Sequence, residues 1–406
     1  MRTNHHLSPP SSRPHILFLS TWYPFPADNG SKIRVHHLLQ ALSAHYDVTL
    51  VAFAFATAQP DTDYPLPHVA TIKLNPYQHN QAPAWQTFLS LRPISSRPIP
   101  AMQQLITSIT TQTQFSAVIA STEMMSSYAY QLEHIPVKIL EEHNSFTRMM
   151  ADRYHNQTDF VRRLRCWLSW QKIAIYERWL FRQFDLITMV SELDGIVTQQ
   201  LAPHPERVAV IPNGVDTQTK RPQPANKMPF SLIYNGALTY QANYDAVHWF
   251  LTAMMPTLKQ LFPSIHLTIT GSTKGVDLAN LPLDNSVTLT GYIDDIAQTV
   301  AQSAICVVPL RVGGGTRLKI LEAMACGTPV VTTTKGAEGL TIQPNHNILI
   351  ADTPHDFINA IKSLFDNPQQ AVHIAQQART LVEQQYDWAR LGEQFVTIIN
   401  QTIVKK

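Results

Sequence analysis

The chain has 406 residues, of which 44% are hydrophobic and 15% are charged. This is enough apolar sequence for two domains with buried cores, and it excludes disorder as the main state. Lysine and arginine number 31 against 29 acidic residues, and the resulting net charge of +2 gives no reason to expect a nucleic-acid partner.

The cysteines and the apolar runs indicate the cellular compartment in which the protein works. Cys166, Cys306 and Cys326 are too few and too scattered for a disulfide framework or a CxxC metal site, and they suit small buried residues in a reducing compartment. The apolar run at 16–19 is too short for a signal peptide, and no window reaches the roughly 18 apolar residues of a transmembrane helix. We therefore expect a cytoplasmic protein, either free or peripheral on the inner face of the cytoplasmic membrane.

Short β-rich runs alternate with longer helical patterns, which predicts an α/β fold whose helices cover parallel sheets. The first half begins with a buried strand at 15–20, a Pro/Gly loop, a helix at 31–42 and a returning strand at 47–53. Further strands are expected at 117–121, 137–140, 186–190 and 208–211. Together they predict one doubly wound domain.

A linker and a second domain follow. Residues 217–227 contain Pro and Ala breaks and no apolar period, as is typical of a linker. The pattern then restarts, with strands expected at 231–234, 266–270, 287–290, 304–310, 329–333 and 347–350. We expect two similar Rossmann-like domains facing across a cleft, with ligands beyond the carboxyl ends of the strands.

The stretch 304–333 reads as strand, glycine loop, helix, glycine stop and strand. Its glycines at 313–315 allow a ligand to approach the backbone, and the free N–H groups at the start of the helix form an anion site. Arg317 and Lys319 add two cations, and Glu322 can accept hydrogen bonds from a ribose diol. This combination suits a sugar nucleotide, the alternative being a glycine turn before a solvated surface helix.

The residues of this stretch, GGGTRLKILEAMACGTPVV, resemble the nucleotide-binding signature of the family 4 glycosyltransferases, which have the GT-B fold of two Rossmann-like domains. Other segments fall in the family's order: Asn29-Gly30, Val190-Ser191-Glu192, IPNGVD at 211–216, VTLTGY at 287–292 and GAEG at 336–339. The likeness spans nearly the whole chain, closely in the second half and mainly in layout in the first.

The resemblance implies a domain plan and an activity. Residues 14–217 would form the acceptor domain and 228–385 the donor domain, and 386–406 would form a helix that packs back on the first domain. The implied activity is retaining transfer of a sugar from a nucleotide-diphosphate sugar to a glycan or lipid-linked acceptor, in surface polysaccharide biosynthesis. Neither a metal nor another cofactor is expected.

By similarity to the family, donor-binding roles fall on the second domain. Glu322 would hold the ribose, and the backbone around Gly291 and Tyr292 would meet the base. The diphosphate would lie against the loop formed by Gly314, Gly315 and Thr316.

Two further roles fall on the first domain. Gly30 would approach the donor phosphate, and His143, in the segment Leu-Glu-Glu-His-Asn at a strand end, would be the family's active-site histidine. Glu142 is a less favoured candidate for the role of His143, and a histidine merely satisfied by hydrogen bonds is the structural alternative.

The sequence departs from the family pattern at two places. Gly314 stands where the family has a glutamate that contacts the donor sugar. The loop that begins at Gly236, itself predicted to bind the donor, lacks the family's arginine and lysine. We expect Arg317 and Lys319 to replace them and to stabilise the leaving nucleoside diphosphate.

Those departures keep two other functions open. A catalytically degenerate scaffold that binds sugar nucleotides would show the same losses. A nucleotide-sugar epimerase shares the fold, but it needs acid/base carboxylates in the cleft, and Gly314 argues against them.

Metal binding is not expected. The triplet Asp61-Thr62-Asp63 has the DxD form that binds Mn²⁺ or Mg²⁺ in the other large glycosyltransferase fold, and we interpret it as a solvated turn. The pairs His5-His6 and His36-His37 lack the i, i+4 spacing of a zinc helix.

A basic, tryptophan-containing segment at 159–184 predicts a long helix with Asp159 as its cap. Five arginines and one lysine stand against Asp159 and Glu177, a local charge of +4 from six cations and two acids. Such a helix suits an anionic membrane surface, where a lipid-linked acceptor would lie. A core helix with solvated arginines is the alternative.

Overall fold

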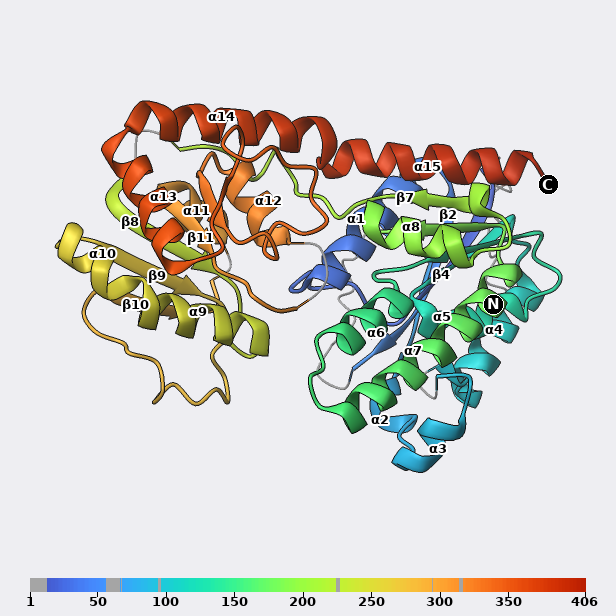
Figure 1. The fold of residues 1–406 in the computed structure, drawn as a ribbon. Helices are drawn as coiled ribbons and strands as arrows, with labels where there is room; N and C mark the ends of the chain where they lie inside the picture. The colour runs from blue at the N-terminus through green and yellow to red at the C-terminus, as the bar shows by residue number, and fades with distance from the viewer. Residues whose placement is uncertain are drawn as a thin grey trace, which may run out of the picture. The chain divides into compact units, whose positions relative to one another are not determined.

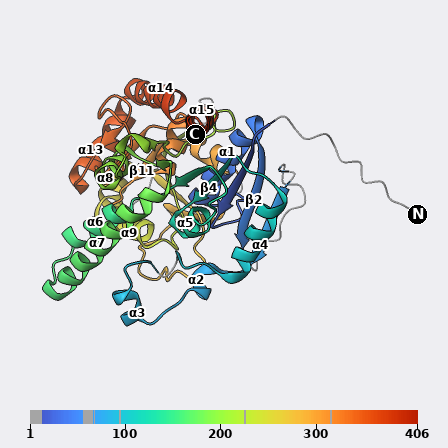
Figure 2. The same cartoon turned by 90° about the vertical axis from the view of Figure 1, so that its right-hand side faces the viewer.

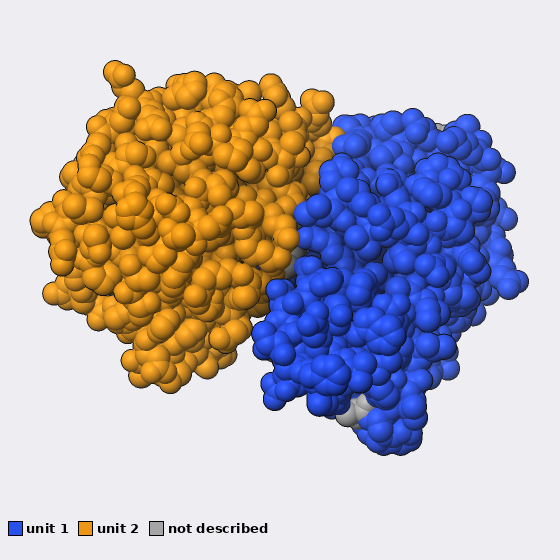
Figure 3. Space-filling view, in the orientation of Figure 1, with its two compact units in different colours: residues 1–211, 392–406 blue, residues 212–391 orange. Residues whose placement is uncertain are grey.

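Two parallel sheets organise the chain in the computed structural model, which describes residues 13–55, 66, 68–93, 96–223, 227–293, 295–313 and 317–406. Each sheet belongs to its own unit (Figure 1). Unit 1 comprises the chain up to Ile211 together with Gly392–Lys406, and unit 2 comprises Pro212–Leu391 (Figure 3). The α/β class predicted from the sequence is confirmed.

The seven strands of unit 1 follow the order β3-β2-β1-β4-β5-β6-β7, and every neighbouring pair is parallel. Most of the strands are nearly continuous apolar runs, as expected where helices cover both faces of a sheet. Their bounds are β1 His15–Ser20, β2 Asp47–Ala54, β3 His68–Lys73, β4 Ala117–Ser121, β5 Val137–Glu141, β6 Leu186–Met189 and β7 Val208–Val210.

The helices of unit 1 are amphipathic to different degrees. In α1 (Gly30–His45), Val35, Leu38, Leu39 and Leu42 are buried at helical spacing, and Asn29 caps the first turn. The others are α2 Pro76–His79, α3 Ala84–Leu89, α4 Pro100–Gln112, α5 Glu123–Tyr130, α6 Phe146–His155, α7 Phe160–Leu180 and α8 Glu192–Leu201. Figure 2 shows the pair α6–α7 projecting from the body of unit 1.

The last helix, α15 (Trp388–Val404), belongs to unit 1 from Gly392 onward. A Cβ on Gly392 would lie 2.6 Å from the Cβ of Ala41, so glycine permits the close approach of α15 to α1. Tyr46 Oη donates to Asn400 Oδ1 at 3.0 Å, and Lys406 pairs with Asp185 at 3.1 Å. These contacts tie residues 392–406 to the sheet and helix of unit 1.

The six strands of unit 2 follow the order β10-β9-β8-β11-β12-β13, again with parallel neighbours. They are β8 Met228–Asn235, β9 His266–Thr270, β10 Val287–Gly291, β11 Ser303–Val308, β12 Val330–Thr332 and β13 Leu349–Ile350. The helices are α9 Gln241–Ala253, α10 Met255–Leu261, α11 Ile296–Gln302, α12 Leu318–Ala325, α13 Pro354–Asp366 and α14 Pro368–Gln385. Cys306 and Cys326 are buried in the core of this unit, as expected of small apolar residues.

All twelve strands predicted from the sequence are present, with ends that differ by at most a few residues. The sequence analysis missed β3, because its residues are only partly buried and follow a polar, Pro-rich stretch. The triplet at 61–63 and the pair His5-His6 lie outside the described residues. No group of three or more potential metal ligands occurs in the described part of the chain, and none of its helices is long and apolar enough to cross a membrane.

Arg379 fixes a segment near the beginning of unit 2. From α14, its guanidinium donates to the carbonyl oxygens of Thr217 at 2.8 Å, Lys220 at 2.5 Å and Ala325 at 2.5 Å. One side chain thereby joins the predicted linker to the carboxyl end of α12.

We predict that Arg379→Ala lowers the free energy of unfolding by about 2–3 kcal/mol, because three partly buried carbonyl groups lose a charged donor. Arg379→Lys should recover only part of this loss, since an ammonium cannot reach all three oxygens from one position. Urea unfolding measures both changes. Arg390→Ala, an exposed residue of α15, is the control, and equal stability of the Arg379 and Arg390 variants would contradict the role of Arg379.

Candidate functional site

A buried polar cluster lies at the carboxyl ends of the central strands of unit 1. Ser121 ends β4 and Glu141 ends β5, the two strands that follow β1 in the sheet order. In open parallel sheets, this is the edge at which ligands bind. Both side chains are fully buried, so their polar atoms need partners within the protein.

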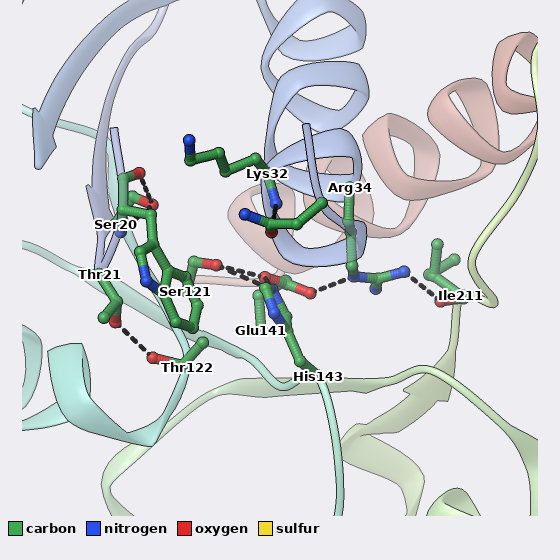
Figure 4. A network of polar contacts seen from close by, with 11 residues as sticks. Ser20, Thr21, Lys32, Arg34, Ser121, Thr122, Glu141, His143 and Ile211 are labelled. Carbon is green, nitrogen blue, oxygen red and sulfur yellow. Dashed lines mark hydrogen bonds and ion pairs between the residues drawn. The ribbon is translucent and has the colours of Figure 1, made fainter. Parts of the chain in front are cut away.

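Both oxygens of the Glu141 carboxylate are occupied (Figure 4). Arg34 Nε donates to Oε1 at 2.5 Å, and Ser121 Oγ donates to Oε2 at 2.6 Å. His143 Nε2 lies 3.1 Å from the same Oε2. Arg34, itself only 1% exposed, also donates from Nη1 to the carbonyl oxygen of Ile211 at 2.9 Å.

This environment keeps Glu141 ionised. Burial alone would raise the pKa of the Glu141 carboxyl, but the facing His143 and Arg34, with hydrogen bonds from His143 and Ser121, outweigh burial. The pKa of Glu141 therefore lies well below its ordinary value. A permanent negative charge thus stands beside the imidazole of His143.

The imidazole of His143 is held on two sides. Its ring stacks on Trp22, with centroids 6.3 Å apart and planes 19° from parallel, and Nε2 also lies 3.2 Å from Ser121 Oγ. A carboxylate at Nε2 requires a proton on that nitrogen, which leaves Nδ1 for another partner. Nδ1 is buried and has no hydrogen-bond partner among the described residues. An unpaired buried nitrogen is unfavourable, so this atom is suited to a ligand hydroxyl.

Glu142 has different surroundings. It is buried, and burial raises its pKa well above the ordinary value, with the nearby carboxylates of Glu123 and Glu177 raising it further. No hydrogen bond joins its side chain to His143 among the described contacts. The geometry thus favours His143 over Glu142 as the polar group offered to a ligand.

Gly30 is the first residue of α1, one turn before Arg34. Its neighbour Asn29 caps the helix by accepting from Lys32 N at 3.1 Å. The remaining free N–H groups of the first turn therefore lie on the helix that also supplies Arg34 to the cluster (Figure 4).

The predicted cation Lys319 lies in a second cluster, in unit 2. Its ammonium is 2.8 Å from Tyr234 Oη and 2.8 Å from Asn243 Oδ1, and it stands 4.2 Å from the centroid of the Tyr234 ring. Tyr234 also donates to Asn243 at 2.7 Å. The first turn of α12 is thereby joined to β8 and α9 near the carboxyl end of the sheet.

Two features make Lys319 responsive to a ligand. Burial lowers the pKa of its ammonium to about 7, against smaller opposing effects of Cys306 and Glu322. A Cβ on Gly236 would lie 2.6 Å from Lys319 Nζ, so the absence of a side chain at Gly236 leaves room for the ammonium beside this loop. An anion bound there would restore the positive charge of Lys319.

Glu322 follows one turn after Lys319 on α12. Asn235 Nδ2 donates to its Oε2 at 2.9 Å, and Lys220 Nζ lies 3.5 Å from Oε1. Its side chain is 21% exposed, so the carboxylate retains lone pairs for a diol.

Arg317 contacts the protein itself. It is 5% exposed, and its Nη2 donates to the carbonyl oxygen of Gly313 at 2.8 Å. Gly313 has a φ of +100°, a conformation that favours glycine. Arg317 therefore braces the start of the glycine loop, whereas Gly314, Gly315 and Thr316 lie outside the described residues.

The two residues predicted to meet the base lie at the end of β10. Gly291 has a φ of +70°, and its carbonyl oxygen accepts from Gly271 N at 2.8 Å. Tyr292 is 65% exposed, which leaves its ring available for contact. Both stay predicted donor-binding residues.

Sequence reasoning missed several members of both clusters: Arg34, Ser121, Glu141 and Trp22 in unit 1, and Tyr234 and Asn243 in unit 2. Glu141 carried a usable signal, since it directly follows the strand predicted at 137–140 and stands two residues before His143. Arg34 carried none, because 107 residues separate it from Glu141 and no motif links them.

Solved structures with the same architecture define the class. Sucrose-phosphate synthase from Thermosynechococcus elongatus matches over 97% of this chain and 100% of its own, with a TM-score of 0.73 and 19% identity. The Anabaena protein HepE, in complex with UDP-glucose, matches over 96% and 100%, with a TM-score of 0.67 and 16% identity. The fold is the GT-B fold of glycosyltransferases.

Family models and curated relatives identify the family. The model "Glycosyltransferase Family 4" matches residues 28–219, and "Glycosyl transferases group 1" matches residues 229–367. Together the two matches cover most of the chain, which belongs to glycosyltransferase family 4.

Curated relatives match over only part of their length. The chain is 28% identical to glycogen synthase of Mycobacterium tuberculosis over 235 residues, which are 54% of each protein. It is 28% identical over 161 residues to a GDP-mannose-dependent phosphatidylinositol monomannoside mannosyltransferase of Corynebacterium glutamicum, 37% of this chain and 42% of the relative. The chain thus spans about half the length, or less, of these relatives.

We predict that Arg34→Met lowers the free energy of unfolding at pH 7 by about 3–5 kcal/mol, because the Glu141 carboxylate loses its buried partner. In the wild type, the pKa of Glu141 is lower in the folded than in the unfolded protein. Its ionised carboxylate therefore contributes to the free energy of unfolding in full above about pH 4.3, and this contribution is lost as the pH falls through the folded pKa. Without Arg34 the pKa of Glu141 rises, so the difference from wild type should shrink in acid.

Urea unfolding at pH 7 and pH 4.5 measures this change. Arg34→Met combined with Glu141→Gln should recover part of the stability, since neither buried charge is then unpaired. A double variant as unstable as Arg34→Met at both pH values would contradict the coupling of the two residues.

Proposed function

We propose that the protein transfers a sugar from a nucleotide-diphosphate sugar to a glycan or lipid-linked acceptor, with retention of anomeric configuration and without a metal ion. The observation that carries the proposal is the second cluster, in which Gly236, Lys319 and Glu322 combine an open backbone, a buried cation and a carboxylate. A diphosphate and a ribose need these groups.

Leaving-group stabilisation is the main chemical task. When the glycosidic bond to the nucleotide breaks, negative charge develops on the diphosphate, and the Lys319 ammonium lies in a low-dielectric site where such charge is stabilised most strongly. Arg317 contributes by holding the glycine loop through Gly313. The released phosphate oxygen would take the proton of the acceptor hydroxyl.

His143 would orient one of the reacting sugars. Its Nε2 is engaged by Glu141, and its Nδ1 is free to hydrogen bond to a sugar hydroxyl. We infer that Glu141 and Arg34 act as positioning residues, because they fix the ring and its proton without being offered to the ligand.

Two relatives suggest which donors and acceptors to test. HepE was solved with UDP-glucose, and the Corynebacterium relative is named for GDP-mannose and a phosphatidylinositol acceptor, which supports UDP or GDP sugars and lipid-linked acceptors as substrates to test. We propose a cytoplasmic reaction in surface polysaccharide assembly.

The test of the proposed function is binding and turnover by the purified full chain with UDP, GDP and their common sugar conjugates, in EDTA and in Mg²⁺. We predict selective binding of one nucleoside diphosphate, equal in both buffers. Glu322→Ala should weaken it by about ten- to a hundredfold, because a charged hydrogen-bond acceptor is lost. His143→Ala should leave nucleotide binding unchanged and reduce turnover.

The control is Glu393→Ala, an exposed carboxylate of α15 that pairs only with His45 among the described contacts. Tight nucleotide binding without donor hydrolysis or transfer would favour the catalytically degenerate scaffold, and interconversion of the donor sugar would indicate an epimerase. An inverted anomer in the product, seen by NMR, would contradict retention.

Proton uptake by Lys319 gives an independent prediction. Its pKa of about 7 in the free protein should rise when a diphosphate binds, because the bound anion favours the ammonium. Affinity should therefore weaken above pH 7, by up to about tenfold per pH unit, until the pKa of the complex is reached. Calorimetry from pH 7 to 9 measures the affinity for the diphosphate, and Lys319→Met should remove its dependence on pH. An unchanged pH profile in that variant would exclude Lys319 as the group that takes up the proton.

A further inference from the structure

Helix α7 exposes six large apolar side chains to solvent, and four of them share one face. Phe160 is 80% exposed, and Leu164, Trp167 and Ile175 are each at least two-fifths exposed. At 100° per residue, these four positions lie within an arc of about 80°. The buried apolar residues of the helix, Tyr176 and Leu180, lie on the other side. The core-helix alternative therefore accounts for the end of α7 and leaves this apolar stripe unexplained.

Cations lie within the stripe and to either side of it. By the same helical geometry, Arg178 lies within its arc and Arg163 lies about 40° beyond one edge, while Lys172 and Arg165 lie about 60° and 80° beyond the other. The only acidic residue of the helix, Glu177, is buried and is held by the backbone N–H groups of Phe146 and Thr147. The exposed charged side chains of α7 are therefore all cations.

A second apolar element lies beside this helix. Lys172 Nζ donates to the carbonyl oxygens of Thr87, at 3.1 Å, and Phe88, and stands 5.5 Å from the centroid of the Phe88 ring. These contacts hold α3 next to the middle of α7, as both ribbon views show (Figures 1 and 2). Trp85 is 64% and Leu89 is 71% exposed, and the sequence has no aspartate or glutamate from residue 64 to residue 122.

We propose that α3 and the stripe of α7, which we call the α3–α7 surface, bind an anionic lipid bilayer, with the apolar side chains in the interface and the cations at the headgroups. Exposed tryptophan and phenylalanine near arginine and lysine match the interfacial region of such a bilayer, and the absence of exposed acids within α3 and α7 avoids repulsion by the negative charge of the bilayer. The inference deepens the proposed function, since a lipid-linked acceptor lies at a membrane.

The experiment is co-sedimentation of the full chain with vesicles of phosphatidylcholine alone or with phosphatidylglycerol. Wild type should bind the anionic vesicles and not the neutral ones. Arg165→Glu with Arg178→Glu should weaken binding by about 30-fold or more. Phe160→Ser with Leu164→Ser, and Trp85→Ser with Leu89→Ser, should each weaken it as well.

Two matched variants control for general effects. Arg162→Glu changes an exposed cation on the opposite side of α7, and Val372→Ser removes an exposed apolar residue of α14. Both should bind vesicles nearly as wild type does, and thermal melts should show that all variants are folded.

Binding that ignores phosphatidylglycerol, or that survives the changes on the α3–α7 surface, would overturn the proposal. So would a concentration-dependent dimer lost in Phe160→Ser with Leu164→Ser, since the face would then join two copies of the chain. Because vesicle binding requires no turnover, it can succeed where the proposed transfer fails, and the reverse also holds.

Discussion

The buried ion pair between Arg34 and Glu141 is the interaction on which unit 1 depends. It joins α1 to the end of β5, and through Ile211 it also holds the residue that follows β7. A buried pair of this kind contributes little net stability compared with an apolar pair, yet the loss of either partner is strongly destabilising. Such a pair is best explained by what it positions, and here that is the imidazole of His143.

Unit 2 uses the opposite arrangement. Lys319 has hydrogen-bond partners but no facing carboxylate within ion-pair distance among the described residues, and its pKa is consequently lowered towards neutrality. Unit 1 therefore carries a buried charge that a protein partner neutralises, whereas unit 2 carries a buried lysine that no carboxylate of the described residues neutralises. The first arrangement gives rigidity, and the second lets any anion bound beside Lys319 raise its pKa.

The sequence predicted the sheets well because parallel strands buried on both faces consist of nearly unbroken apolar runs, such as those at 15–20 and 117–121. It also indicated Lys319, Glu322 and His143, which sit in motifs or at strand ends and stay predicted site residues. It failed for Arg34, Tyr234 and Asn243, because their roles arise from tertiary neighbours far apart in the chain. Arg317 illustrates a related limit: the sequence indicates a cation near an anion site but not that the guanidinium is already bound to Gly313.

The division of unit 1 into two stretches of sequence has a consequence for synthesis. Residues 392–406 cover α1 near Ala41 and pair with Asp185, yet they are translated after all of unit 2. Domains generally fold as units while the chain emerges, N-terminal first. Unit 1 must therefore wait, with part of α1 uncovered, until the whole of unit 2 has left the ribosome, so it begins to form before unit 2 and is completed after it.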